Sequence, residues 1–278
     1  MMLRRAISGS IYVLSGAIGF LAFLYPFFTP LQGQSSMVTG HSQDAPIVTV
    51  ALVALSLIAL LIELQGQAIS AKTVAMLGVL VAITSVLRFI EVVIPAPGGF
   101  SPVFAPVILV GYVFGGRFGF LMGTFTLLAS ALVTGGVGPW LPYQMYAAGW
   151  VGMSAGWLGW LVRRGPKRHG DAGRTMVRGL EVLLLCVLGF IWGLLFGAIM
   201  NIFFWPLATG PADQTWSAGT GLVETLSRYG VFYLATSLGW DLVRAVGNAA
   251  LILLLGAPVV RALMRFRQRF QFEAIPDA

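Results

Sequence analysis

Five polar or aromatic residues recur at helical spacing in the last apolar segment of the chain, near residues 229–262. They are Tyr233, Ser237, Asp241, Arg244 and Asn248, separated by four, four, three and four positions. This spacing places them on one face of a helix. A membrane segment tolerates charged side chains only where they face protein or water. The face therefore predicts either a ligand-binding surface or an internal brace in which Asp241 and Arg244 neutralise each other.

The composition determines the kind of element that carries this face. Residues of the AVILMFWYC class make up 58% of the 278 residues and charged residues only 10%, whereas a soluble domain has about 25% charged residues. Apolar segments lie near 7–29, 47–63, 72–94, 103–116, 118–135, 143–162, 179–205 and 229–262. Each should be helical, because an unpaired backbone polar group in hydrocarbon costs several kcal/mol. The last is long for one helix, and we expect it to break, or to begin outside the hydrocarbon, near 233–239. The sequence thus predicts an all-α polytopic membrane protein.

The basic residues predict the orientation of these helices. Arg228 lies at one set of helix ends, and Arg88 and Arg244 lie within segments. The other basic residues share the opposite set of ends: Arg4, Arg5, Lys72, Arg117, Arg163, Arg164, Lys167, Arg168, Arg174, Arg178, Arg261, Arg265, Arg267 and Arg269. The positive-inside rule makes those ends cytoplasmic, and eight crossings put both termini there. We expect a multi-pass protein of the plasma (inner) membrane, in which 30–46, 95–102, 135–142 and 206–228 face outward.

This orientation brings further polar and aromatic residues to the outer ends of the helices. The outward connections 95–102 and 134–142 are rich in Gly and Pro and carry no charge, which suits a lid over a bound molecule. Aromatic walls with a few polar groups are typical of small-molecule sites. The expected substrate-binding set is Phe100, Trp140, Tyr143, Gln144, Trp150, Asn201, Trp205, Ser237, Asp241, Arg244 and Asn248. Thr84, Arg88 and Glu91 share a face near the outer end of the third segment.

Structural interpretations of the same residues remain open. Aromatic residues near helix ends commonly form interfacial belts, and Asn201 is explained equally by an interhelical hydrogen bond. The Gly- and Pro-rich connections are also compatible with tight turns. Arg88 with Glu91, like Asp241 with Arg244, has the spacing of a simple ion pair within one helix.

The sequence gives little support to catalysis or metal binding. The single cysteine, Cys186, lies in an apolar segment, and His41 and His169 lie in expected loops. We therefore expect no metal site and no cofactor. The chain lacks a G-x-x-x-x-G-K-[ST] phosphate loop, so any ATP hydrolysis must come from another protein.

A stripe of small residues follows a different face of the third segment. Ala71, Ala75, Gly78, Ala82 and Ser85 are separated by four, three, four and three positions. Small residues on one stripe let another helix approach closely in lipid. The partner is either another segment of this chain or a separate subunit.

Three stretches of the chain together carry a family resemblance. They are IPAPGGFSPVF (94–104), VGYVFGGRFGF (110–120) and GGVGPWLPYQM (135–145). They resemble the substrate-binding S components of energy-coupling-factor (ECF) vitamin transporters. The resemblance extends roughly from Lys72 to Arg265, and the Gly-Pro-Trp-x-Pro-x-Gln-Met stretch is its most specific part.

The resemblance implies an architecture and a set of partners. S components have six helices with both ends cytoplasmic, and they bind a vitamin between the outer loops and the last three helices. They work with a transmembrane T component and a pair of ATPases. A small-residue motif in their first core helix contacts the T component, and Ala71, Ala75, Gly78 and Ala82 match it in chemistry and location. Residues 1–68 would then be a two-helix N-terminal addition, and residues 69–278 the six-helix substrate-binding domain.

The expected function is therefore that of a non-catalytic, substrate-binding subunit of an ECF-type ABC importer. Its aromatic residues favour a planar or ring-containing micronutrient, such as a vitamin, a corrinoid or another vitamin precursor. Membrane lipid is an expected partner and nucleic acid is not. One alternative is a stand-alone secondary transporter with Asp241 or Glu91 as its proton site. Another is an intramembrane enzyme that uses Asp241, Arg244 or Glu91 in acid–base chemistry.

Overall fold

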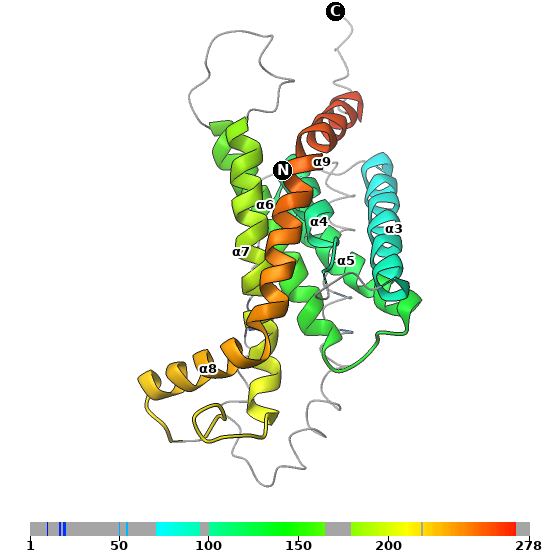
Figure 1. The fold of residues 1–278 in the computed structure, drawn as a ribbon. Coiled ribbons are helices and arrows are strands. Elements are labelled where there is room, and N and C mark those ends of the chain that lie inside the picture. The colour runs from blue at the N-terminus through cyan, green and yellow to red at the C-terminus, as the bar shows by residue number, and fades with distance from the viewer. Residues whose placement is uncertain are drawn as a thin grey trace, which may run out of the picture.

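In a computed structural model the described residues form an all-helical fold (Figure 1). The structure describes residues 71–94, 100–164, 179–217 and 219–270, with a few single positions before residue 71. The helices are α3 (Ala71–Val93), α4 (Phe104–Phe114), α5 (Gly116–Thr134), α6 (Leu141–Arg164), α7 (Gly179–Phe204), η4 (Trp205–Leu207), α8 (Leu222–Thr236) and α9 (Leu238–Phe270). These ranges contain no strand, which confirms the predicted helical class. Apart from the single positions, the predicted N-terminal addition, residues 1–68, lies outside the described residues.

Four of the described helices are long and apolar enough to cross a membrane. These segments are Lys72–Val93, Gly116–Thr134, Gly179–Phe204 and Leu238–Gln268. α6 has the length to cross, with 24 residues, but it is less apolar. α4 has only 11 residues, which is about 16 Å of helix against a hydrocarbon core of about 30 Å. The described region is therefore a multi-pass membrane fold, and its division into a six-helix core stays a prediction.

The short helix α4 lies at the centre of the described bundle. It is apolar around its whole circumference, and nine of its residues are buried. It packs against α5, α6, α7 and α9. A helix without a polar face lies either in a protein core or in lipid. α4 is too short to cross the membrane, and it lies in the core among four other helices.

Close helix pairs position the longer helices around α4. α5 and α6 meet at Gly119 and Gly152, where a Cβ on Gly152 would overlap the backbone carbonyl of Gly119. α7 and α9 lie side by side (Figure 1). Small residues of α7 also lie directly on α9, because a Cβ on Gly193 would overlap Ala245 and one on Gly197 would overlap the carboxylate of Asp241. The α7–α9 contact therefore fixes where Asp241 points.

The predicted break in the last apolar segment is confirmed. α8 ends at Thr236 and α9 begins at Leu238. Backbone hydrogen bonds continue across the break, from Ser237 N–H to the Tyr233 carbonyl (3.0 Å) and from Asp241 N–H to the Ser237 carbonyl (2.9 Å). In Figure 1 α8 lies crosswise to α7 and α9 at one end of the bundle. The break is thus a tight corner between two helices, and it places Ser237 at the start of α9.

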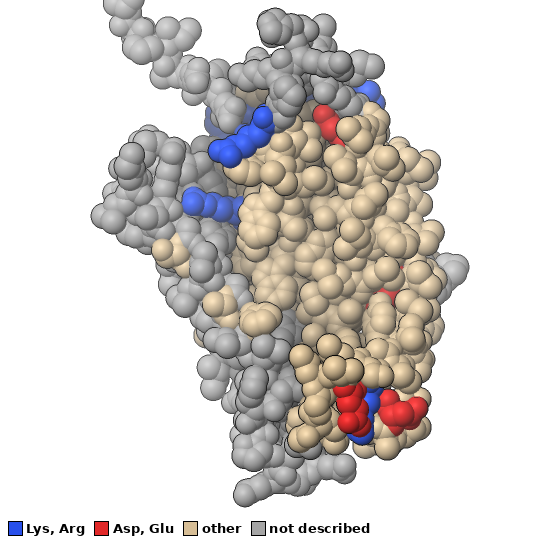
Figure 2. Space-filling view, turned by 90° about the vertical axis from the view of Figure 1, so that its left-hand side faces the viewer, with Lys and Arg blue, Asp and Glu red and all other residues tan. Residues whose placement is uncertain are grey.

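Basic residues from separate helices converge at the opposite end. Arg163 of α6 donates to the Tyr112 carbonyl (2.9 Å) and Arg267 of α9 donates to the Val113 carbonyl (2.6 Å). Both carbonyls belong to the last turn of α4, where backbone acceptors lack helical partners and attract cations. Figure 2 shows charged residues gathered toward the two ends of the described surface, with an almost uncharged face between them. That face is the expected lipid-facing surface, and the side of the membrane on which the basic end lies stays a prediction.

One described position of the N-terminal segment contacts the core. Gly19 is buried, and a Cβ there would come within 2.6 Å of the Tyr146 ring of α6. Gly19 therefore packs directly on α6, within the region that the sequence assigns to substrate binding.

Candidate functional site

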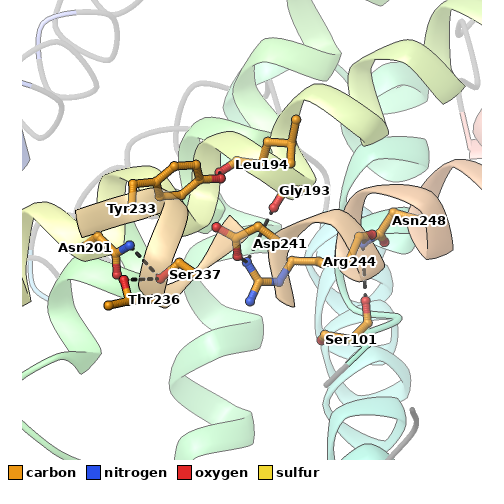
Figure 3. Close-up of polar contacts among 10 residues, drawn as sticks. All are labelled: Ser101, Gly193, Leu194, Asn201, Tyr233, Thr236, Ser237, Asp241, Arg244 and Asn248. Atoms are coloured by element: carbon orange, nitrogen blue, oxygen red, sulfur yellow. Dashed lines mark hydrogen bonds and ion pairs between the residues drawn. The ribbon is translucent and has the colours of Figure 1, made fainter. Parts of the chain in front are cut away.

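Asp241 and Arg244 of α9 form an ion pair beside α7 (Figure 3). Arg244 Nη1 lies 2.5 Å from Asp241 Oδ1, and the Asp241 side chain is 2% exposed. The same nitrogen donates to the Gly193 carbonyl at 3.4 Å, and the guanidinium carbon lies 5.6 Å from the centre of the Phe196 ring. The second carboxylate oxygen, Asp241 Oδ2, is buried and has no hydrogen-bond partner in the described structure. One oxygen of the carboxylate is therefore committed to Arg244 and the other is left as an unmatched acceptor.

A second polar contact joins α7 to the corner between α8 and α9. Asn201 Nδ2 donates to Ser237 Oγ at 2.6 Å. One helical turn along α8, the Tyr233 hydroxyl donates to the Leu194 carbonyl at 3.3 Å. These bonds hold the α8–α9 corner against the C-terminal half of α7, so Asn201, Ser237 and Asp241 lie along one edge of the α7–α9 contact (Figure 3).

Asn248 connects α9 to the start of α4. Its Oδ1 accepts from the Ala105 backbone N–H at 3.1 Å, which satisfies one of the unpaired donors at a helix N-terminus. Its Nδ2 donates to the Ser101 carbonyl (3.4 Å) and to the Arg244 carbonyl (2.8 Å). Phe100, in the same connection, lies against Gly247, where a Cβ would overlap its ring. Asn248 is fully buried, and its bonds fix the connection that precedes α4 onto α9.

Two charged residues of α3 extend the polar group from the other side. Ser101 Oγ donates to Glu91 Oε2 at 2.7 Å, so Glu91 turns toward the connection and makes no ion pair with Arg88 in the described structure. Arg88 and Arg244 are close enough to interact electrostatically with each other and with Glu91. The group therefore joins α3, the start of α4, α7 and α9. We call Arg88, Glu91, Ser101, Asp241 and Arg244 the outer polar cluster, after the end of the bundle that the sequence predicts to face outward.

The predicted aromatic residues occupy several separate positions. Tyr143 of α6 is almost fully buried, with its ring centre 4.6 Å from that of Phe203 of α7. Trp205 stacks edge-on against Tyr229 at 5.1 Å, and its Nε1 donates to the Gln214 carbonyl at 2.8 Å. Thus Tyr143 lies at the α6–α7 contact, and Trp205 ties the connection after α7 to α8.

The remaining predicted residues lie on α6 and the connection before it. Trp140 covers Gly138 of its own connection and is partly exposed, as is Gln144. Trp150 lies beside Tyr146 on the same helix, with ring centres 6.2 Å apart. Of the predicted set, the structure joins Phe100, Asn201, Ser237, Asp241, Arg244 and Asn248 through the start of α9, and no hydrogen bond or ring contact in the described structure connects Trp140 or Gln144 to that helix.

An open hollow lies on the outside of the corner between α8 and α9. Its volume is about 450 Å³, and it is lined by Leu234, Ala235, Thr236, Gly239 and Trp240. None of these residues belongs to the predicted substrate-binding set. The described residues also contain no group of three His, Cys, Asp or Glu side chains that would hold a metal ion.

Comparison with protein families identifies the region that contains these contacts. The family model described as "ECF transporter, substrate-specific component" matches residues 72–256, which is more than half of the chain. The chain belongs to this family. Comparisons with curated proteins and with solved structures find no match. The resemblance seen in the sequence is therefore confirmed, and the protein is a transporter subunit of the S-component type and not a catalytic one.

The matched region of this S component includes the whole outer polar cluster and Asn248. Sequence reasoning included Asp241 and Arg244 in the expected binding set but omitted Arg88, Glu91 and Ser101. The signal for Glu91 was present, because a carboxylate inside an apolar segment is rare. Ser101 had no such signal, since its role depends on the connection before α4 turning back toward α3.

Proposed function

We propose that the protein is the membrane-embedded substrate-binding subunit of an ECF-type ABC importer. It captures a vitamin or related micronutrient from outside and passes it to a T component and two ATPase subunits. The outer polar cluster is the observation that carries this proposal. It gathers charged side chains from α3 and α9 at one end of a membrane bundle, inside the region that matches the family.

The cost of this arrangement supports a role in binding. A charged residue near the centre of a membrane helix is unfavourable by about 2.5–3.5 kcal/mol, and apolar packing of the same volume would serve equally well as a brace. The Asp241–Arg244 pair leaves one buried carboxylate oxygen without a partner, which a purely structural pair would be expected to satisfy. The polar surface also continues through Ser237 and Asn201 toward the corner between α8 and α9.

The small-residue stripe on α3 is the proposed contact with the T component. Ala75, Gly78 and Ala82 are exposed, and a Cβ on Gly78 would meet nothing within 4 Å. These three residues are thus available for a close helix–helix contact, which small residues favour in lipid, whereas Ser85 at the end of the stripe is buried against α5. With Ala71, the three exposed residues form the proposed docking surface.

The test separates binding from transport by enlarging one residue of the stripe. Gly78→Trp should abolish uptake in cells that also produce a T component and ATPases, because the bulky ring prevents close approach. Binding by the purified subunit, measured for the compound that native mass spectrometry finds associated with it, should persist. Ile83→Trp is the matched control, since Ile83 is exposed on a different face of the same helix, and it should retain both activities. Loss of binding together with uptake would show that the stripe packs within the chain, and normal uptake by Gly78→Trp would place the T component elsewhere.

A further inference from the structure

Among the described residues, Arg88 is a cation without a hydrogen-bonded partner, near the end of α3 that the sequence predicts to face outward. Its Nε is buried and makes no hydrogen bond, and within the described structure its guanidinium forms no ion pair or hydrogen bond. A guanidinium in a membrane segment is normally paired with a carboxylate or with backbone carbonyls. Arg88 has a carboxylate three positions away in Glu91, yet Glu91 instead accepts from Ser101 at 2.7 Å.

The other charged groups of the outer polar cluster are already engaged. Arg244 is bound to Asp241 Oδ1 at 2.5 Å and to the Gly193 carbonyl. The Asn248 side chain is also engaged, because it is hydrogen-bonded to backbone groups of Ala105, Ser101 and Arg244. The cluster therefore contains one unmatched cationic donor, Arg88, and an Arg244 that lies close enough to repel it electrostatically. Glu91 lies near enough to attract Arg88 but makes no ion pair with it in the described structure, and an anion bonded directly to Arg88 would offset this repulsion further.

The cluster also contains one unmatched acceptor. Among the described residues Asp241 Oδ2 accepts no hydrogen bond, because the nearby Tyr233 hydroxyl donates to the Leu194 carbonyl instead. The side chain is 2% exposed, since the carboxylate rests directly on Gly197. A buried carboxylate oxygen is stabilised by an N–H or O–H donor. The two groups would therefore bind different parts of a ligand: Arg88 would bind an oxyanion, and Asp241 Oδ2 would accept from a hydrogen-bond donor.

We propose that the substrate is a small organic anion whose carboxylate or phosphate binds Arg88 and whose N–H or O–H group donates to Asp241 Oδ2. The planar guanidinium matches either oxyanion through two parallel hydrogen bonds. This inference rests on the proposed function, because it assumes that the outer polar cluster contacts the substrate. It makes Arg88 the residue that selects acids over their neutral analogues.

The experiment uses the purified full chain and the small-molecule fraction of yeast extract as the probe. The protein is incubated with the extract and washed, and retained compounds are identified by liquid chromatography–mass spectrometry after denaturation. Wild type should retain a compound that carries a carboxylate or phosphate. Arg88→Gln should retain it about 10- to 100-fold less tightly, and Arg88→Lys should restore part of the binding. Arg228→Gln is the matched control, because Arg228 is paired with Glu224 on α8 at 2.5 Å, and it should bind like wild type.

A neutral analogue of the retained compound decides the role of Arg88 even if Arg88→Gln does not fold. The methyl ester of a carboxylate, or the dephosphorylated form of a phosphate, should bind wild type at least about 10-fold more weakly than the acid. It should bind wild type and Arg88→Gln equally, because the group that Arg88 recognises is gone. The mass of the retained compound distinguishes a carboxylate from a phosphate.

Three results would overturn the inference. Retention of an uncharged or cationic compound by wild type would exclude anion recognition while leaving the proposed function standing. Equal binding of the acid and the neutral analogue by wild type would show that Arg88 does not recognise the negative charge of the substrate. Retention of no compound by wild type would contradict the proposed function itself, and this inference with it.

Discussion

Replacing Gly197 with alanine tests the α7–α9 contact that positions Asp241. A Cβ at this position would overlap all three atoms of the Asp241 carboxylate group. The carboxylate has no free space into which it can move, because its side chain is 2% exposed and is bound to Arg244. Either α7 and α9 separate or the ion pair is displaced.

Both routes destabilise the fold, and their magnitudes set the expected range. Forcing one methyl group into a well-packed contact costs about 1–3 kcal/mol. Breaking a buried ion pair costs about 3–5 kcal/mol. The intrinsic preference of a helix for alanine over glycine offsets only about 0.5–1 kcal/mol. We therefore expect Gly197→Ala to lower the free energy of unfolding by about 1 kcal/mol, the middle of the overpacking range less the middle of the offset, and by more if the ion pair breaks.

The matched control is Gly78→Ala on α3, measured on the solitary subunit. A Cβ on Gly78 would meet nothing within 4 Å, so only the helix preference remains and the change should be neutral or stabilising. Unfolding by SDS titration in mixed micelles gives both free energies. The two substitutions are chemically identical, and the reasoning predicts opposite signs. A neutral Gly197→Ala, or an equal loss in both variants, would refute the account of the α7–α9 contact.

Three further changes test the remaining parts of the structure. Arg244→Met alone should lower the free energy of unfolding by about 3–5 kcal/mol, because it leaves the buried Asp241 carboxylate without its partner. The double change Asp241→Leu with Arg244→Met should lower the free energy of unfolding less, but it should weaken ligand binding by about 10-fold or more. Unchanged binding in the double variant would show that the pair is structural. Ser101→Ala removes the partner of Glu91 and should lower the free energy of unfolding by about 1–3 kcal/mol in the same titration, so an unchanged value would mean that this bond does not hold the connection before α4. Deletion of residues 1–68 should leave a membrane-inserted core that is less stable, because Tyr146 loses its contact with Gly19; failure of the shortened chain to insert would contradict the two-part division.

The sequence predicted the helices well because hydrocarbon leaves few alternatives. Apolar runs longer than about 20 residues must be helical in a bilayer, and α3, α5 and α7 appear close to the expected bounds. The corner before α9 was predictable from length alone. The sequence did not predict that α8 begins at Leu222. The charged residues Glu224 and Arg228 instead favoured an exposed connection over this stretch. These two residues in fact form an ion pair one helical turn apart, which supports the helix.

The sequence predicted one part of the candidate site, the polar face of α9, but not the residues that contact it from other helices. The polar face of α9 follows from spacing within one helix, so Ser237, Asp241, Arg244 and Asn248 were identified together. Their partners depend on how helices are aligned against one another, which a single sequence does not encode in any periodic signal. The bond from Asn248 to Ala105 spans 143 positions, and the unmatched state of Arg88 depends on Glu91 turning to Ser101. Both required the packed structure.

Transport by purified components tests the central claim most directly. The protein is reconstituted into liposomes alone or with a T component and two ATPase subunits, and accumulation of its bound compound is measured with ATP, without ATP and with an imposed proton gradient. The account predicts that the chain alone binds the compound but accumulates none, and that accumulation requires the partners together with ATP. Accumulation by the chain alone, driven by the proton gradient, would contradict the subunit assignment and would favour a stand-alone carrier that uses Asp241 or Glu91.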